Sequence, residues 1–369
     1  MKLGYNYPIN DMKRRDFLKK TALATAAATL APSLGACKAG GAADGRDQIA
    51  ANLKFRPDGT FTVLQITDTH YIAGDPRSPR ALECVKEAVA AVQPDLIIHT
   101  GDIVFGSPDL ESAREILAPI SESGIPFAVA LGNHDSEFGS TREDIYSCIR
   151  DIKGCINLPP KEGVYGCSND VITLSGASGV ERVFYLFDSM RRAEVKGEED
   201  RYSYDFIRHS QISWYRGHSE RFAAAAGGNP VPALAFFHVP LREMAEGLTA
   251  EGSELIGNQC EAPCPSRLNS GLLAQFLEMG DVEAIVNGHE HNCDFVLRYG
   301  PMFYIYGRYS GCETVYNDLG REGESREKIS GTRVFSFREG EPGFRTWVRL
   351  LGGEQQQKLY LNNRTITRI

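Results

Sequence analysis

The chain has 369 residues, 42% of them hydrophobic, and 48 acidic against 40 basic side chains give a formal net charge of −8. Residues 1–36 carry six of the basic and two of the acidic side chains, so the rest of the chain has a formal charge of about −12. This acidity excludes binding to a nucleic-acid backbone through a broad basic face. There is no internal repeat and no second block of composition, so we expect one folded domain.

The first residues are typical of an export signal. The basic run Lys13–Lys20 contains two adjacent arginines and resembles a twin-arginine signal, with Met12 as an alternative start. The apolar run Thr21–Ala31 that follows is too short and too rich in alanine to remain as a membrane span. The sequence therefore predicts a signal peptide over residues 1–36.

The signal peptide ends in a sequence that resembles a bacterial lipobox, Leu34-Gly35-Ala36-Cys37. Cleavage before Cys37 would leave this cysteine to be lipidated. We therefore expect an exported, periplasmic or cell-surface lipoprotein that is held at the membrane by Cys37, with residues 37–54 as lipidated cysteine and flexible tether. The alternative is an ordinary cleavable signal followed by a chance cysteine.

Helical and strand patterns alternate from residue 55 to residue 350. Short apolar, β-branched runs predict five principal strands: Phe61–Ile66, Leu96–Thr100, Phe127–Leu131, Ala233–Phe237 and Val282–Val286. Helical periodicity predicts five helices between them: Ser78–Val92, Ser107–Ile120, Thr141–Ile152, Ser210–Ala223 and Asn269–Met279. Two further pairs of strands indicate antiparallel additions at the sheet edges: Val171–Leu174 with Arg182–Phe187, and Thr332–Phe337 with Phe344–Leu350. The pattern predicts an α/β domain over residues 55–350 and a C-terminal tail over 351–369.

Each principal strand is followed by side chains that suit metal ions. The segments are Asp68-Thr69-His70, Gly101-Asp102, Gly132-Asn133-His134-Asp135, His238, and Gly288-His289-Glu290-His291, and they hold five of the eight histidines. In open α/β sheets, ligands bind outside the carboxyl ends of the strands, where all five segments are expected. Imidazole, carboxylate and amide oxygen together suit zinc, manganese or iron, whereas an all-oxygen site would suit magnesium or calcium.

Taken in order, these segments resemble the pattern of the calcineurin-like metallophosphoesterase family, which is D-x-H, G-D, G-N-H-D/E, H and G-H-x-H. The resemblance runs from about Phe55 to about Leu350, and it is specific because all five parts occur in order. It implies an α/β fold with four layers, α/β/β/α, and mixed sheets. It also implies a hydrolase that acts on phosphoric ester bonds.

The resemblance further implies a role for each donor. One metal ion would be held by Asp68, His70, Asp102 and His291, and a second by Asp102, Asn133, His238 and His289, with Asp102 bridging the two. The ions would be divalent or trivalent manganese, iron or zinc, and a hydroxide bridging them would attack phosphorus. His134 would be the catalytic histidine that assists the leaving group, and Asp135 would orient its imidazole.

One position departs from the purple acid phosphatases within this family. They have a tyrosine ligand three residues after the G-D aspartate, whereas this chain has Phe105. A phenyl ring cannot coordinate, so the resemblance is to small relatives of those phosphatases that lack the tyrosine ligand, with a colourless centre. Arg308 would bind substrate phosphate through its planar fork, or would serve in an ordinary ion pair.

The remaining candidates have structural interpretations. We expect His99 to be packed beside the site, and His209 and His218 to be solvated on a helix. Glu290 is left out of the metal site because adjacent side chains diverge. The glycine- and proline-rich stretch Ala245–Ser266 is a candidate substrate-facing loop. Within it, Cys260 and Cys264 are spaced for a cross-link outside the cytoplasm, although spacing alone fixes no pairing.

The sequence thus predicts a dinuclear-metal hydrolase of phosphate esters, with phosphomonoesters favoured as substrates. A phosphodiesterase or a pyrophosphatase on the same site is the alternative within the enzyme class, because the same two ions serve all three reactions. A non-catalytic binding lipoprotein is the alternative from another class. Loss of a ligand or of the catalytic histidine would favour it, and none is missing here.

Overall fold

Two mixed β-sheets carry the domain in the computed structural model, which describes residues 45–193, 204–315 and 330–369. The signal peptide, Cys37 and the tether up to residue 44 lie outside the described residues. Within them, one sheet has eight strands in the order β1 (Ala51–Lys54), β5 (Asp170–Gly176), β6 (Gly179–Leu186), β7 (Ala233–Phe236), β9 (Val282–Asn287), β11 (Met302–Tyr306), β10 (Val296–Tyr299) and β8 (Glu254–Ile256). The other sheet has seven, in the order β15 (Thr365–Arg368), β14 (Gln355–Asn362), β13 (Phe344–Leu350), β12 (Gly331–Arg338), β2 (Thr60–Ile66), β3 (Leu96–His99) and β4 (Phe127–Val129).

The inner faces of the two sheets form the central core. Phe61 and Val63 of β2 lie in the same buried cluster as Phe184 of β6 and Phe236 of β7. Leu64, the next residue of β2, belongs instead to a cluster on the outer face. Both faces of the principal strands are therefore covered, which explains why these strands are nearly continuous apolar runs in the sequence.

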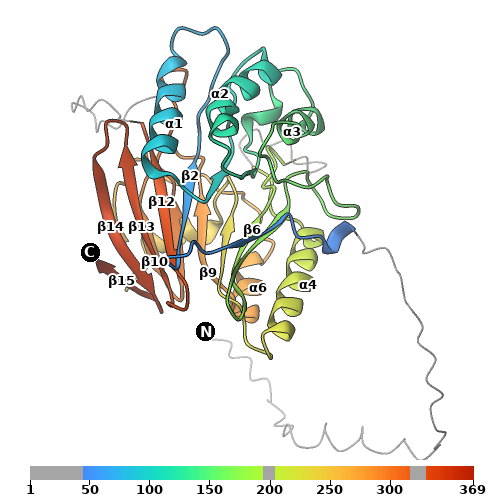
Figure 1. Cartoon of the computed structure of the whole chain (residues 1–369), viewed down its shortest axis with the longest axis vertical. Coiled ribbons are helices and arrows are strands. Elements are labelled where there is room, and N and C mark those ends of the chain that lie inside the picture. Colours follow the sequence, from blue (N-terminus) through green and yellow to red (C-terminus); the bar gives the residue numbers. More distant parts are fainter. Residues whose placement is uncertain (1–44, 194–203, 316–329) are drawn as a thin grey trace, which may run out of the picture. The chain divides into compact units, whose positions relative to one another are not determined.

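Helices cover the two outer faces. The seven-stranded sheet is covered by α1 (Pro79–Val92), α2 (Asp109–Ser123) and α3 (Arg142–Arg150), and the eight-stranded sheet by α4 (His209–Ala225), α5 (Arg242–Gly247) and α6 (Leu272–Met279). Figure 1 shows α1, α2 and α3 grouped together and α4 and α6 grouped apart from them. The predicted four-layer α/β/β/α architecture with mixed sheets is confirmed.

The sheets extend beyond the limits predicted from the sequence. Strand β1 lies within the expected tether and pairs in parallel with β5, and the expected tail forms the hairpin of β14 and β15. The predicted pairs β5–β6 and β12–β13 are antiparallel as expected, but β12 lies inside its sheet, where it also pairs with β2. Strand β14 is polar, and only Leu359 and Leu361 are buried on it, so it lacks the apolar run that marks the central strands.

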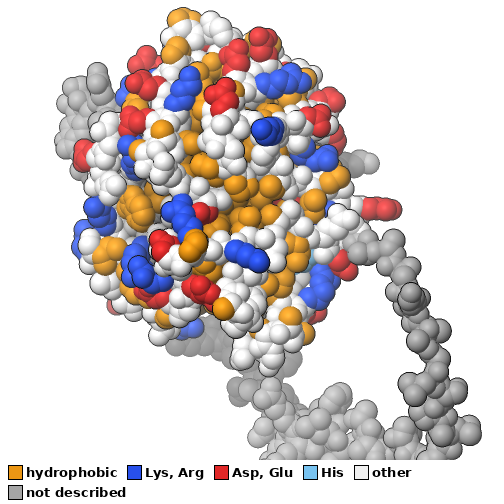
Figure 2. Space-filling model, viewed as in Figure 1, with side chains coloured by type: hydrophobic (Ala, Val, Ile, Leu, Met, Phe, Trp, Pro, Cys, Tyr) orange, Lys and Arg blue, Asp and Glu red, His pale blue; other side chains and the backbone are white. Residues whose placement is uncertain are grey.

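The surface in Figure 2 has acidic and basic side chains interspersed, with apolar side chains gathered across the middle of the face viewed. In the described part of the chain, no helix has both the length and the apolar character needed to cross a bilayer. Cys260 and Cys264 are exposed free cysteines in the structure.

Candidate metal centre

Both sheets contribute to a single cluster of donor side chains at the carboxyl ends of their parallel strands. Asp68 and His70 follow β2, Asp102 follows β3, and Asn133 follows β4, all from the seven-stranded sheet. His238 follows β7, and His289 and His291 follow β9, from the eight-stranded sheet. The five predicted segments therefore meet at the strand ends of the two packed sheets, and all seven predicted ligands are buried.

The backbone is wound unusually at several of these residues. Asp68, His70, Asp102 and His289 have φ angles of 53°, 45°, 52° and 88°, in the left-handed region that non-glycine residues rarely adopt. Residues held in such conformations cluster at functional sites, where the surrounding structure enforces them. The donors are thus turned out of their strands and toward one another.

The first group of donors consists of Asp68, His70, Asp102 and His291, whose candidate ligand atoms all lie within 4.8 Å of one another. His70 Nε2 lies 3.3 Å from Asp102 Oδ2, and His291 Nε2 lies 3.7 Å from Asp68 Oδ1. This is the set that the family resemblance implied for one metal ion.

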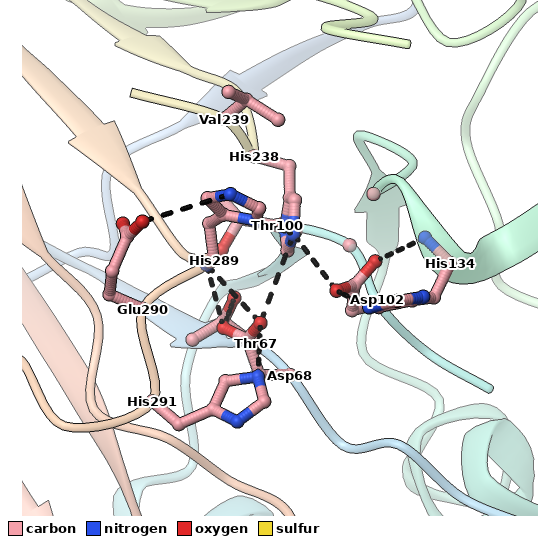
Figure 3. A network of polar contacts seen from close by, with 12 residues as sticks. Thr67, Asp68, Thr100, Asp102, His134, His238, Val239, His289, Glu290 and His291 are labelled. Carbon is pink, nitrogen blue, oxygen red and sulfur yellow. Dashed lines mark hydrogen bonds and ion pairs between the residues drawn. The ribbon is translucent and has the colours of Figure 1, made fainter. Parts of the chain in front are cut away.

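The second group consists of Asp102, His238 and His289, again with ligand atoms within 4.8 Å of one another. His238 Nε2 lies 3.1 Å from Asp102 Oδ2 and 3.3 Å from His289 Nδ1. Figure 3 shows the imidazole of His238 between the carboxylates of Asp102 and Asp68. Because Asp102 belongs to both groups, its carboxylate is placed to bridge two ions.

Several polar atoms of the cluster have no hydrogen-bond partner among the described residues, as expected of atoms that bind metal ions. Both ring nitrogens of His70 and the Oδ1 atom of Asn133 are buried and have no hydrogen-bond partner within the described part of the protein. Unpaired buried polar atoms are costly, and metal ligation is an explanation for them. His238 donates its Nδ1–H to the carbonyl of Thr100 over 2.7 Å, which leaves Nε2 for the site, as expected of a metal-ligating histidine.

The pKa values of Asp102 and His238 also support a cation site. Burial favours the neutral form of Asp102, but the neighbouring His238 and His134 hold the pKa of its carboxyl well below the usual range. Burial would lower the pKa of His238, but Asp102 and Asp68 raise it to about 9. The two buried carboxylates thus draw positive charge to His238. A bound metal cation would supply that charge and would displace a proton held there.

The predicted role of Asp135 was wrong. Its carboxylate accepts hydrogen bonds from the backbone N–H groups of Gly132, Asp102, Ile103 and Val104, at 2.7 to 3.3 Å. It is therefore committed to shaping the two loops that carry Asp102 and Asn133. The ring of His134 instead contacts Glu137, with Nδ1 and Oε2 2.5 Å apart.

The structure decides between the two alternatives for Arg308, and it corrects the prediction for His218. Arg308 is buried and its guanidinium lies 2.6 Å from the carboxylate of Asp294, which favours the ion-pair role over phosphate binding. His218 is buried against the backbone of Arg46, with Nε2 3.0 Å from the carbonyl oxygen, whereas His209 on the same helix is exposed as predicted. His99 is packed beside the site as predicted, and the N–H of Gly101 donates to its Nδ1.

Sequence reasoning missed residues that hold the donors in place. The hydroxyl of Thr67 donates to Asp68 Oδ2 over 2.7 Å, and the N–H of His289 donates to the same carboxylate. Glu290 is buried, which raises the pKa of its carboxyl to about 8, and it accepts hydrogen bonds from the Tyr306 hydroxyl and the Cys264 N–H. The sequence also missed the contact of Glu137 with His134. Here a signal was present, because residues three apart in a helical turn lie on the same side.

Comparison with known proteins finds a matching family model and relatives that are similar over most of this chain. The family model described as calcineurin-like phosphoesterase matches residues 61–293. Probable inactive purple acid phosphatase 28 of Arabidopsis thaliana is 31% identical over 344 residues, which cover 81% of this chain and 82% of the relative. Phosphatase DCR2 of Saccharomyces cerevisiae is 24% identical and is matched over 84% of this chain and 57% of its own length.

A solved structure shares the fold. The dimetal phosphatase from Danio rerio superimposes with a TM-score of 0.54 at 13% identity, over 82% of this chain and 99% of that one. This similarity supports the fold, and the match over residues 61–293 confirms the family that the sequence resembles. The chain belongs to the calcineurin-like phosphoesterase family and is related to purple-acid-phosphatase-like proteins.

Proposed function

We propose that the protein hydrolyses phosphate esters, with monoesters favoured, at a centre that holds two metal ions, of manganese, iron or zinc. One observation carries the proposal: the buried carboxylate of Asp102 belongs to both donor groups and lies beside His134, with Oδ2 4.0 Å from the Nε2 atom. The name of the yeast relative, a phosphatase, supports monoesters over diesters.

The chain's own residues account for most of the chemistry. Two bound ions would supply an activated water and positive charge for the phosphoryl oxygens. Asp102 and Asp68 would offset the charge of the ions, while Thr67 and Thr100 hold Asp68 and His238 in orientation. His134 has 27% of its side chain exposed, whereas the seven donors are buried, so we place it on the side from which substrate would enter. There it can contact the phosphoryl group and give a proton to the departing alkoxide.

Some relatives are named as inactive, as in probable inactive purple acid phosphatase 14 and 28 of Arabidopsis thaliana. This chain retains all seven donors that the family pattern requires, and it retains His134. The proposal is therefore that this protein binds metal and turns over, whereas a binding lipoprotein would take up phosphoester ligands without cleaving them.

Replacement of the bridging aspartate tests the proposal. We expect Asp102→Ala to lower the metal content from near two equivalents to below one and to reduce hydrolysis of p-nitrophenyl phosphate by at least about 10³-fold, since charge stabilisation by both ions would be lost. Asp151 is exposed, so Asp151→Ala is the matched control and should keep the metal content and the activity of the wild type. Wild-type turnover in the Asp102 variant would refute the mechanism.

A substrate panel separates the alternatives on the same site. Protein loaded with manganese, zinc or iron is assayed with a monoester, a bis(p-nitrophenyl) diester and inorganic pyrophosphate. Highest kcat/KM on the monoester is expected, whereas highest kcat/KM on the diester or on pyrophosphate would assign the alternative activity. Two bound equivalents of metal with no turnover of any of the three would favour the non-catalytic lipoprotein.

We also propose export and lipid attachment at Cys37, on the sequence pattern alone. Export as a folded protein would suit an enzyme that receives its ions before it leaves the cytoplasm. Membrane fractionation of the full chain and of Cys37→Ala tests this: the variant is expected in the soluble exported fraction, and unchanged membrane association would contradict lipidation.

A further inference from the structure

We propose that Glu137 is the positioning residue for His134: its carboxylate accepts the Nδ1–H of the imidazole and so directs Nε2 to the metal centre. This role rests on the proposed hydrolysis, in which His134 assists the leaving group. It replaces Asp135, the neighbour expected from the sequence.

The contact is local and direct. His134 Nδ1 and Glu137 Oε2 are 2.5 Å apart, and each side chain is 27% exposed. His134–Ser136 forms a 3-10 turn that Glu137 closes by donating its N–H to the carbonyl of His134 over 3.1 Å. The turn therefore places the two side chains on the same side, where a charged hydrogen bond can form.

Two phenyl rings restrict the imidazole but do not choose between its two orientations, which differ by half a turn about the Cβ–Cγ bond. Phe105 meets the ring edge to face, with centroids 4.9 Å apart at 87°, and Phe138 stacks at 6.5 Å and 28°. A rotation of the ring by half a turn about the Cβ–Cγ bond would keep both contacts, but it would put Cδ2 in the place of Nδ1 and Cε1 in the place of Nε2. The Glu137 carboxylate favours the observed orientation, because Nδ1 faces it while Nε2 faces Asp102.

The other carboxylates nearby have different tasks. Asp135 is fully occupied by backbone N–H groups of the two loops, and Asp102 receives the backbone N–H of His134 over 2.8 Å. At position 105, three residues after Asp102, a phenyl ring packs against His134 and supplies no acceptor. Glu137 is thus the carboxylate that holds the ring.

Leaving-group dependence separates positioning from a general structural role. An alkyl phosphate needs a proton on the departing oxygen, whereas p-nitrophenolate leaves without one. We expect Glu137→Ala to lower kcat on an alkyl phosphate about 10- to 100-fold and kcat on p-nitrophenyl phosphate less than about 3-fold, with metal content unchanged. Glu137→Gln keeps an acceptor oxygen and should recover part of the loss. Glu122→Gln, an exposed carboxylate on α2, should behave as wild type on both esters.

An equal loss on both esters, or no loss on either, would overturn the positioning role. A second measurement does not depend on turnover: ¹⁵N-histidine NMR, with the His134 signals assigned by their disappearance in His134→Asn. A protected Nδ1–H resonance is expected in the wild type and should be lost by exchange with water in Glu137→Ala. If the resonance persists in that variant, Glu137 does not hold the ring. Absence of hydrolysis in the metal-loaded wild type would instead count against the proposed function, and the NMR result would still decide the role of Glu137.

Discussion

Gly132 lies where two metal-bearing loops touch through their backbones. A Cβ atom added at this position would lie 2.2 Å from Asp102 Oδ1 and 2.3 Å from the Asp102 nitrogen. The facing Gly101 has a φ of +90°, and a Cβ there would lie 2.3 Å from the Gly132 nitrogen. Glycine at both positions therefore allows the loops to approach, and this approach brings Asp102 between the two groups of donors.

Gly132→Ala should displace the Asp102 carboxylate, because neither the backbone nor the carboxylate can retreat far in a packed loop. We expect a loss of stability of about 1–3 kcal/mol and a fall in activity of at least about 100-fold, both from steric overpacking. Urea denaturation and the rate of p-nitrophenyl phosphate hydrolysis measure the two effects, and a metal titration shows whether both ions still bind. The matched control is Gly217→Ala in α4, where the nearest atom to an added Cβ is the end of Arg221 at 3.7 Å. A Gly132 variant that binds two ions normally would contradict this account.

At the scale of residues, the sequence predicted the metal-ligand candidates but not the residues that hold them and His134 in place. The seven candidate metal ligands follow strand ends, and topology alone brings strand ends together. Whether Asp135 or Glu137 contacts the ring of His134 depends on which backbone N–H groups face each carboxylate. The conformation of the loop decides this. The ion pair of Arg308 with Asp294 likewise joins residues from two separate loops.

Helix α3 fixes the metal-bearing loop after β4 through its first turn. The helix starts with a capping box between Thr141 and Asp144. From the next position, Arg142 donates to the carbonyls of Gly132 and Leu131 and pairs with Asp188, 2.5 Å away, just after β6. The guanidinium thus links α3, the loop after β4 and an end of the eight-stranded sheet.

Arg142→Ala should lower the free energy of unfolding by about 3–5 kcal/mol, because it leaves the carboxylate of Asp188 buried without its partner. Asp188→Ala should cost a similar amount, and the double variant less than the two losses combined. Urea denaturation of all three forms a double-mutant cycle. Arg114→Ala, exposed on α2, should change stability by less than about 0.5 kcal/mol. Additive losses would show that the pair is not coupled.

At the scale of elements, the helices and principal strands were predictable because their apolar periodicity reports burial on known faces. The ends differed by only a few residues, as for Ser210–Ala223 against the observed His209–Ala225. The missed strands are β1, β8, β10, β11, β14 and β15. Strand β11 is apolar and buried inside its sheet, whereas the other five are short or polar strands toward the sheet margins. Their place follows from hydrogen bonding to a neighbour, which leaves no periodic signal of its own.

One buried histidine links α4 to the first residues of the described chain. His218 on α4 closes over the backbone of Arg46, at the start of the described chain, and Trp214 donates to the same carbonyl over 3.1 Å. Burial lowers the pKa of His218 from 6.5 to about 4. The folded state thus resists protonation of this ring while the unfolded state accepts it.

Stability should therefore fall as the pH drops from 6.5 to 4. The contribution of His218 is fully present above pH 6.5, where the ring is neutral in both states, and up to about 3 kcal/mol is lost by pH 4, where the unfolded state holds the proton. Urea denaturation at a series of pH values, compared between the wild type and His218→Gln, isolates this contribution. His209→Gln, exposed on the same helix, should keep the wild-type slope. Identical slopes in all three proteins would exclude the effect.

The left-handed backbone at Asp68, His70, Asp102 and His289 has a consequence for how ions enter. Each such residue costs about 1 kcal/mol or more, and the two packed sheets around the site can sustain that strain. A pocket preorganised in this way requires no refolding on loading. Uptake of zinc or manganese should then follow a single exponential whose rate is governed by dehydration of the incoming ion.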